Sequence, residues 1–127
     1  MRLLEIHLEV ASVERALEFY ARLFPHARQV GWDDRSAVAL VFDDGAALGI
    51  WTRGKLGKYK GRAGEHTHYA FQVTLDELEI YRLRLTQLGV EFIDHAWTPP
   101  HKSIYFFDPD GHQGEFMTKD WNDIASE

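Results

Sequence analysis

The stretch SIYFFDPDGHQGEFM, residues 103–117, decides the fold of this chain. Ser103–Phe107 is aromatic and β-branched and Asp108–Gly111 is a strong turn signal, so the segment predicts a β-hairpin. Successive side chains of a strand face opposite sides, and Glu115 therefore faces away from Phe116. If Phe116 packs in a core, Glu115 lies either on a solvated edge strand or on a functional surface.

Composition limits the classes to which the protein can belong. Its 127 residues, 45% of them hydrophobic, suffice for one domain with a core or for two small halves that share one. The absence of cysteine excludes disulfides, zinc–thiolate sites and thiol nucleophiles. A net charge of -6 without a basic run argues against nucleic acid or an anionic membrane as partner. The N-terminal sequence resembles neither a signal peptide nor a membrane span, so we expect a cytoplasmic protein.

The first half of the chain predicts one strand, one helix and three strands. Residues 2–10 alternate apolar and polar side chains, as a half-buried strand does. Ser12 is a good N-cap for a helix that Pro25 stops. Short strands are expected at residues 28–32, 36–42 and 46–51. The inward stripe of the helix is expected at Val13, Ala16, Leu17, Tyr20 and Phe24.

The same order begins again at His66, after a glycine-rich, basic segment at residues 53–65. That segment is either a solvated connection or a loop that covers an anionic ligand. Thr74 and Glu77 fit a capping box at the start of the second helix. Expected elements are a strand from His66, a helix over 74–88 with an inward stripe of Leu75, Leu78, Tyr81, Arg82 and Leu85, strands at 90–93, 103–107 and 113–118, and a tail at 119–127.

The duplication brings ligating residues to equivalent positions. His7 and His68 open equivalent strands, and counting four residues beyond the matching turn glycines sets Gly49 opposite Glu115. A pseudo-twofold arrangement would gather these four residues, of which His7, His68 and Glu115 can bind a metal. Two imidazoles and a carboxylate suit Mn²⁺, Fe²⁺, Zn²⁺ or Co²⁺ and leave positions open for a substrate with two neighbouring oxygens.

The βαβββ duplication, the strand starts HLEV and HTHYAF, and the hairpin YFFDPDGHQGE resemble the vicinal-oxygen-chelate superfamily, which includes glyoxalase I, fosfomycin-resistance proteins, extradiol dioxygenases and bleomycin-binding proteins. The resemblance implies an α+β fold in which two βαβββ modules, residues 1–52 and 66–118, form one cup-shaped sheet in a single domain. It also implies a homodimer with sites shared between chains. The implied metal ligands are His7, His68 and Glu115, and Gly49, which cannot coordinate, stands at the fourth position.

Within that superfamily the hairpin is most similar to that of the fosfomycin-resistance thiol transferases. This likeness implies that the three ligands hold Mn²⁺ or a similar ion, that Tyr105 and Ser103 line the substrate cavity, and that a thiol such as glutathione is a cosubstrate. His95 falls where a basic residue would grip a phosphonate. Glu9 replaces a threonine near the substrate, and is either a solvated strand residue or a base beside the metal.

Other activities stay open. Ring-cleaving dioxygenases share the two-His, one-Glu set, and His95 with Tyr105 would then act as acid and base beside a catecholate. His66 is either an exposed strand-start residue, an acid/base group or a spare ligand, and the role of His101 is undecided. Lyase and epimerase chemistry also fit. The alternative of another class is a metal-free bleomycin-binding protein, in which Trp32, Trp51 and Trp97 would line a groove for a cationic drug; in an enzyme, Trp51 would contact the substrate.

Overall fold

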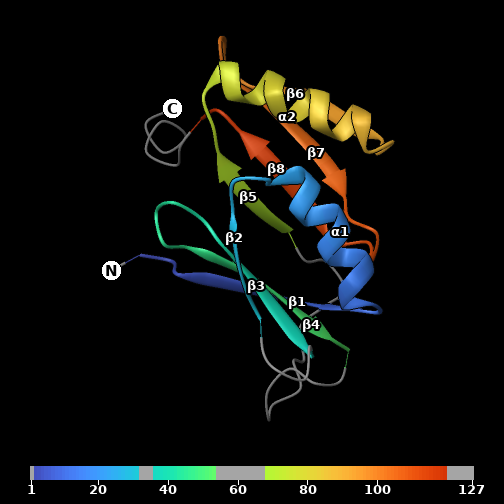
Figure 1. The fold of residues 1–127 in the computed structure, drawn as a ribbon. Helices are drawn as coiled ribbons and strands as arrows, with labels where there is room; N and C mark the ends of the chain where they lie inside the picture. Colours follow the sequence, from blue (N-terminus) through green and yellow to red (C-terminus); the bar gives the residue numbers. More distant parts are fainter. Residues whose placement is uncertain (1, 32–35, 54–67, 120–127) are drawn as a thin grey trace. The chain divides into compact units, whose positions relative to one another are not determined.

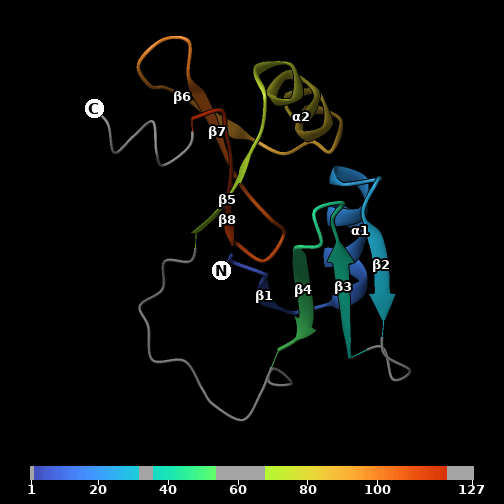
Figure 2. The same cartoon turned by 90° about the vertical axis from the view of Figure 1, so that its left-hand side faces the viewer.

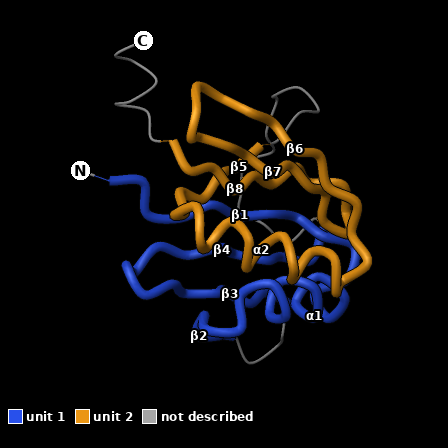
Figure 3. Tube along the Cα trace, turned by 90° about the horizontal axis from the view of Figure 1, so that it is seen from above, with its two compact units in different colours: residues 1–64 blue, residues 65–127 orange. Residues whose placement is uncertain are grey.

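The chain divides into two compact units, Met1–Gly64 and Glu65–Glu127 (Figure 3). The computed structural model describes residues 2–31, 36–53 and 68–119. Each unit contains one βαβββ module with a mixed four-stranded sheet, so the predicted α+β duplication is confirmed. Among the described residues, neither helix has the length and apolarity needed to cross a membrane.

The first unit is a sheet with strand order β1-β4-β3-β2 and one helix (Figure 1). Strand β1 runs parallel to β4, and the other neighbours are antiparallel. A parallel pair needs a long crossover connection, which helix α1 and strands β2 and β3 supply. The elements are β1 (Glu5–Val10), α1 (Val13–Leu23), β2 (Arg28–Gly31), β3 (Ala37–Val41) and β4 (Ala47–Thr52).

Helix α1 packs on β3 and β4 through a stripe that differs in part from the predicted one. Its buried residues are Val13, Ala16, Phe19, Tyr20 and Leu23, whereas Leu17 is only partly buried. Phe24, just past the end of the helix, is buried as predicted, whereas the prediction missed Phe19 and Leu23. Leu8 and Val10 of β1 are buried as the alternation predicts, but Leu4 precedes the paired strand and is 53% exposed.

The second unit repeats this plan with strand order β5-β8-β7-β6. Strand β8 is bonded to β5 on one side and to β7 on the other, so Glu115 is not on an edge strand. The carboxylate is 4% exposed, and the solvated-edge interpretation of this residue is wrong. The elements are β5 (His68–Gln72), α2 (Leu75–Gln87), β6 (Phe92–Ala96), β7 (Lys102–Phe107) and β8 (Gln113–Met117).

Helix α2 covers one face of this sheet (Figures 1 and 2). The ring of Tyr81 stacks on that of Phe116 with 4.1 Å between centroids, and Leu78 and Leu85 are fully buried. The predicted stripe is wrong at Leu75, which is 42% exposed because it lies in the first turn, beyond this contact. Arg82 instead reaches the rim of the sheet, where it forms a bidentate ion pair with Asp94.

Local signals set the ends of α2. The capping box is present: Thr74 Oγ1 accepts from the Glu77 amide, and the Glu77 carboxylate accepts from the Thr74 amide. At the other end, Gly89 has a φ of 71° and the Val90 amide donates to Leu85. That bond closes the helix, which is why β6 begins at Phe92 and not at Val90 as predicted.

Candidate functional site

One imidazole and one carboxylate meet on the face of the second sheet that points away from α2. His68 Nε2 lies 2.8 Å from Glu115 Oε1. The parallel register pairs Ala70 with Glu115 and His68 with Gln113, so His68 lies two residues from the position opposite Glu115 and on the same face of the sheet. The side chain of Glu115 is 5% exposed and that of His68 is 32% exposed. The site is thus built on a central strand and opens to solvent at the histidine.

The other oxygen of the Glu115 carboxylate, Oε2, does not contact His68 in this way. Glu115 Oε2 is buried and forms no hydrogen bond within the described residues. A buried carboxylate oxygen without a partner is costly, and a cation is the usual way to satisfy it. An imidazole nitrogen beside a carboxylate is also a donor set that divalent first-row metals accept. His68 and Glu115 therefore fit a divalent ion.

The His68–Glu115 pair contains two of the three residues predicted to be metal ligands. Among the residues that the structure describes, no group of three or more His, Cys, Asp or Glu side chains is arranged to hold an ion. The third predicted ligand, His7, belongs to the first unit, and a site that joins it to His68 and Glu115 stays a prediction.

Tyr105 extends the site along β7. It lies directly opposite Glu115 in the register, and its ring centroid is 5.8 Å from that of His68. Burial raises the pKa of the Tyr105 phenol, and the charge of Glu115 raises it further. At neutral pH this phenol therefore keeps its proton and can donate a hydrogen bond to an oxygen of a ligand.

Ser103 and His95 lie on the same face, farther along the sheet. Ser103 is fully buried, and its hydroxyl accepts from the indole of Trp97 at 2.8 Å. His95 is exposed on β6; its ring lies edge-on to Trp97 at 4.5 Å and 6.3 Å from the ring of Tyr105. The hydroxyl of Ser103 thus positions Trp97, and His95 is more accessible than Ser103 to a substrate.

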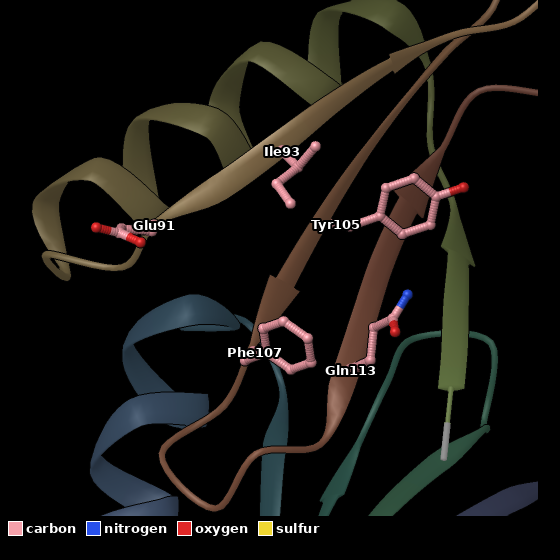
Figure 4. A pocket seen from close by; sticks show the side chains of 5 residues that line it. All are labelled: Glu91, Ile93, Tyr105, Phe107 and Gln113. Atoms are coloured by element: carbon pink, nitrogen blue, oxygen red, sulfur yellow. The ribbon is translucent and has the colours of Figure 1, made fainter. Parts of the chain in front are cut away.

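A pocket of about 360 Å³ opens beside Tyr105 on this face (Figure 4). Ile93 and Phe107 contribute exposed apolar side chains to it, 68% and 57% exposed respectively. Sequence reasoning did not assign them to the site. Alternation along β7 could have placed Phe107 on the face of Tyr105, whereas Ile93 joins that face only through the pairing of β6 with β7. The lining residues are Glu91, Ile93, Tyr105, Phe107 and Gln113.

His7 has its own surroundings in the first unit. It pairs with Gly49 of β4, and a Cβ at Gly49 would lie 2.2 Å from His7 Nδ1. The imidazole therefore lies over a backbone that has no side chain. The indole Nε1 of Trp51 donates to Nδ1 at 2.7 Å, and His7 Nε2 lies 3.1 Å from Glu5 Oε1. Alternation places Trp51 on the same face of β4 as Gly49, and the pairing of β1 with β4 brings that face beside His7.

Glu9 and His66 complete the set of predicted residues. Glu9 follows His7 by two residues and is exposed, and the structure gives no hydrogen bond or ion pair between them in the described part of the chain. His66 lies outside the described residues, as does Trp32. The structure thus brings together His68, Glu115 and Tyr105 in one unit and His7 with Trp51 in the other.

Comparison with known proteins identifies the family. The sequence profile of the Glyoxalase/Bleomycin resistance protein/Dioxygenase superfamily matches residues 2–116. The chain belongs to this superfamily. It is also 31% identical over 118 residues to metallothiol transferase FosB from Lysinibacillus sphaericus (strain C3-41), with 86% of this chain and 76% of that protein aligned. FosB from Bacillus licheniformis is 29% identical over 114 residues, covering 86% and 70% of the two chains.

Solved structures show the fold of this superfamily member. The fosfomycin resistance protein FosX from Listeria monocytogenes, complexed with Mn(II) and sulfate, matches with a TM-score of 0.76 at 23% identity, covering 98% of this chain and 95% of that one. A lactoylglutathione lyase from Agrobacterium tumefaciens matches with a TM-score of 0.76 at 18% identity, covering 91% and 92%. The glyoxalase-like architecture is thus shared with proteins of different activities.

Proposed function

We propose that this protein is a divalent-metal-dependent enzyme that adds a thiol to a small oxygenated electrophile, with His7, His68 and Glu115 as metal ligands. The observation that carries the proposal is the His68–Glu115 pair, whose buried Oε2 lacks a partner in the described chain. The relatedness to metallothiol transferases supports thiol transfer over the other activities of the superfamily.

The donor set of imidazole and carboxylate suits Mn²⁺, Fe²⁺, Zn²⁺ or Co²⁺, and such an ion would supply Lewis-acid chemistry toward two neighbouring substrate oxygens. The side chains around the pair fit a ligand of this kind. Tyr105 offers a protonated phenol because its pKa is raised by burial and by Glu115. His95 is an exposed ring on the same face and is placed to meet an anionic group of the substrate.

The proposed reaction is balanced without an oxidant. With an epoxide as substrate, the thiol sulfur forms a bond to a ring carbon, the carbon–oxygen bond of the ring breaks, and the proton lost by the thiol ends on the released oxygen. Tyr105 donates a hydrogen bond to that oxygen as its charge develops. A thiol such as glutathione is the cosubstrate.

We also propose that the two modules of the chain form one cup-shaped sheet by pairing in a homodimer. Within the described residues, each sheet has two edge strands, β1 and β2 in the first unit and β5 and β6 in the second. Such edges are commonly covered by pairing with another module or chain. In a domain-swapped dimer, His7 would come from one chain and His68 with Glu115 from the other.

The experiment is an anaerobic metal-reconstitution series on the full chain, with Mn²⁺, Fe²⁺, Zn²⁺ or Co²⁺ added in turn. Each sample is assayed with an epoxide and glutathione, with a hemithioacetal, and with catechol and O₂. We expect thiol consumption with Mn²⁺, together with a rise in Tm on Mn²⁺ addition that Glu115→Gln abolishes. Asp43→Asn, in an exposed turn of the first unit, is the matched control and should keep both responses.

Two results would overturn the proposal. If none of the metals binds to protein prepared without chelator, a metal-free binding protein of the bleomycin-resistance type is favoured. If O₂ is consumed with catechol and iron alone, the protein is a ring-cleaving dioxygenase, in which a carbon–carbon bond of the ring breaks and both atoms of O₂ end in the open-chain product. The proximity of His95 to Tyr105, 6.3 Å between ring centroids, is the observation that favours this second activity.

A further inference from the structure

We infer that Trp51 is a positioning residue that holds His7 in a metal-free state, and that its indole must leave His7 when a divalent ion binds there. The inference rests on the proposed function, because it takes His7 as a metal ligand. In this view, the neighbouring strand β4 controls the metal affinity of His7 through Trp51.

The hydrogen bonds of His7 define which ring nitrogen carries the proton. An indole N–H is a donor only, and Trp51 Nε1 lies 2.7 Å from His7 Nδ1. Nδ1 is therefore an acceptor without a proton, and Nε2 carries the proton of the neutral ring. The position of Glu5 agrees, since its carboxylate oxygen lies 3.1 Å from Nε2 and can accept that proton's hydrogen bond.

Gly49 fixes the ring in this position. A Cβ at residue 49 would lie 2.2 Å from Nδ1, 2.8 Å from Cε1 and 3.1 Å from Cγ, so the imidazole occupies space that a side chain at residue 49 would fill. Trp51 is two residues farther along the same strand and on the same face. Its ring centroid is 5.9 Å from that of His7. Strand β4 thus supplies both the glycine that leaves space for the imidazole and the indole that donates a hydrogen bond to it.

Metal binding is incompatible with this hydrogen bond at either nitrogen. An ion bound at Nδ1 takes the lone pair that the indole uses. An ion bound at Nε2 displaces the proton of Nε2, and the neutral ring must then carry its proton on Nδ1. Two N–H groups would face each other across 2.7 Å, so Trp51 must move. Both routes release the indole, and Trp51 therefore opposes metal binding by the strength of its bond to His7.

The first measurement is nuclear magnetic resonance of the full chain with Zn²⁺ as a diamagnetic probe. The indole signal of Trp51 is assigned by its loss in Trp51→Phe. In the metal-free protein, the ring nitrogen shifts of His7 should report the tautomer with the proton on Nε2. On addition of Zn²⁺, the Trp51 indole signal should move, and His7→Ala should abolish that movement. The opposite tautomer, or an unmoved Trp51 signal while Zn²⁺ binds through His7, overturns the inference.

The second measurement is the affinity for Mn²⁺. Removing a donor that competes with the metal should tighten binding in Trp51→Phe by about two- to tenfold, the range that one net hydrogen bond provides. Trp97→Phe is the matched control, because its indole donates to the Ser103 hydroxyl at a similar distance and not to a ring nitrogen. We expect it to leave the affinity within about twofold of the parent value, well below the hydrogen-bond effect. Equal or weaker Mn²⁺ binding by Trp51→Phe overturns the inference.

If the proposed metal ligands are wrong, the binding measurements give a different pattern. If His7→Ala binds Mn²⁺ as tightly as the parent chain, His7 is not a ligand, and the inference falls together with that ligand set. If His7→Ala binds more weakly but Trp51 does not respond, the ligand set stands and only the role of Trp51 is wrong. The tautomer of His7 is read from the unaltered chain, so that part of the resonance experiment tests the inference even if Trp51→Phe fails to fold.

Discussion

Gly49 shows how a residue without a side chain serves a site. In the sequence, Gly49 stands at the position where a fourth metal ligand would be expected, and it cannot coordinate a metal. In the structure it gives the imidazole of His7 a place on the strand, because a Cβ there would lie 2.2 Å from Nδ1. At the scale of single residues, the position of the His7 ring depends on the absence of a Cβ at Gly49 as well as on the hydrogen bond from Trp51.

The first prediction follows from that contact. Gly49→Ala should displace His7, because the new methyl group and the ring cannot both occupy this space. We expect at least tenfold weaker Mn²⁺ binding and a loss of about 1–3 kcal/mol of unfolding free energy, as is usual for an overpacked site. Titration with Mn²⁺ and urea denaturation measure the two effects.

Gly31→Ala is the control for this substitution. Gly31 is also a strand residue, but among the described residues a Cβ there would meet only Val38 Cγ2, at 4.0 Å, an ordinary contact. It should leave Mn²⁺ binding unchanged. Should Gly49→Ala behave like Gly31→Ala, the steric role of Gly49 is wrong.

At the scale of elements, helix α2 combines a narrow apolar stripe with a capping box at its N-terminus. Only Leu78, Tyr81 and Leu85 are buried along its length, while Ile80 and Leu83 are exposed. Most helical stability in proteins comes from packing an amphipathic face, so weak amphipathicity raises the share that falls to the ends. The helix covers the sheet whose opposite face carries His68 and Glu115, and its loss would therefore reach the site.

The second prediction tests this cap. Thr74→Ala removes the oxygen that accepts from the Glu77 amide and should lower the unfolding free energy by about 1 kcal/mol. Thr86→Ala, at an exposed position in the last turn, is the matched control and should cost less than about 0.5 kcal/mol, because alanine favours the helix. Urea denaturation of both variants measures the difference, and equal effects would contradict the prediction.

The third prediction concerns the ion pair between α2 and β6. The hydrogen bond from Arg82 lowers the pKa of Asp94. A carboxylate whose pKa is lower in the folded state stabilises the protein above its unfolded pKa, about 3.9, and this contribution disappears as the pH falls through the folded pKa. Asp94→Asn should therefore destabilise the protein at pH 7, by at most about 1 kcal/mol because the pair is exposed.

The measurement is urea denaturation of the parent chain and of Asp94→Asn from pH 7 to pH 2. The difference between them should be constant at neutral pH and shrink toward zero below the unfolded pKa. A difference that grows as the pH falls would contradict the assigned sign. Asp43→Asn, at an exposed turn position, should show no such convergence because it starts with little difference from the parent.

At the scale of the whole molecule, the two modules divide the predicted ligands between them. His7 lies in one unit and His68 with Glu115 in the other. A site made of all three residues requires two modules to pair, either within one chain or between two.

The fourth prediction distinguishes these arrangements. A mixed dimer of His7→Ala and Glu115→Ala chains contains one intact and one doubly altered site if each site is shared between chains. Mixing the two inactive variants should then restore Mn²⁺ binding and thiol-transfer activity to about half of the mixed dimers' sites. No recovery, with mixed dimers verified by differently tagged chains, would show that each site lies within one chain.

The sequence by itself determined the order of elements, the duplication and the candidate ligands. Alternation, capping residues and turn signals act over a few neighbouring residues. The sequence therefore predicts, without a structure, the turn at residues 108–111, the capping box at Thr74 and the end of the first helix before Pro25. Comparing the two halves was enough to pair Gly49 with Glu115. It was not enough to place the histidines, since His7 lies opposite Gly49 whereas Ala70, and not His68, lies opposite Glu115.

Only the tertiary structure decided what surrounds those residues. Strand order placed β8 in the middle of its sheet and so buried Glu115, and neither fact is encoded in the local pattern of residues 113–117. The hydrogen bond of Trp51 to His7 joins residues 44 positions apart. The physical reason is that burial and hydrogen-bond partners depend on which strands become neighbours, and that choice is made by the packing of the whole sheet.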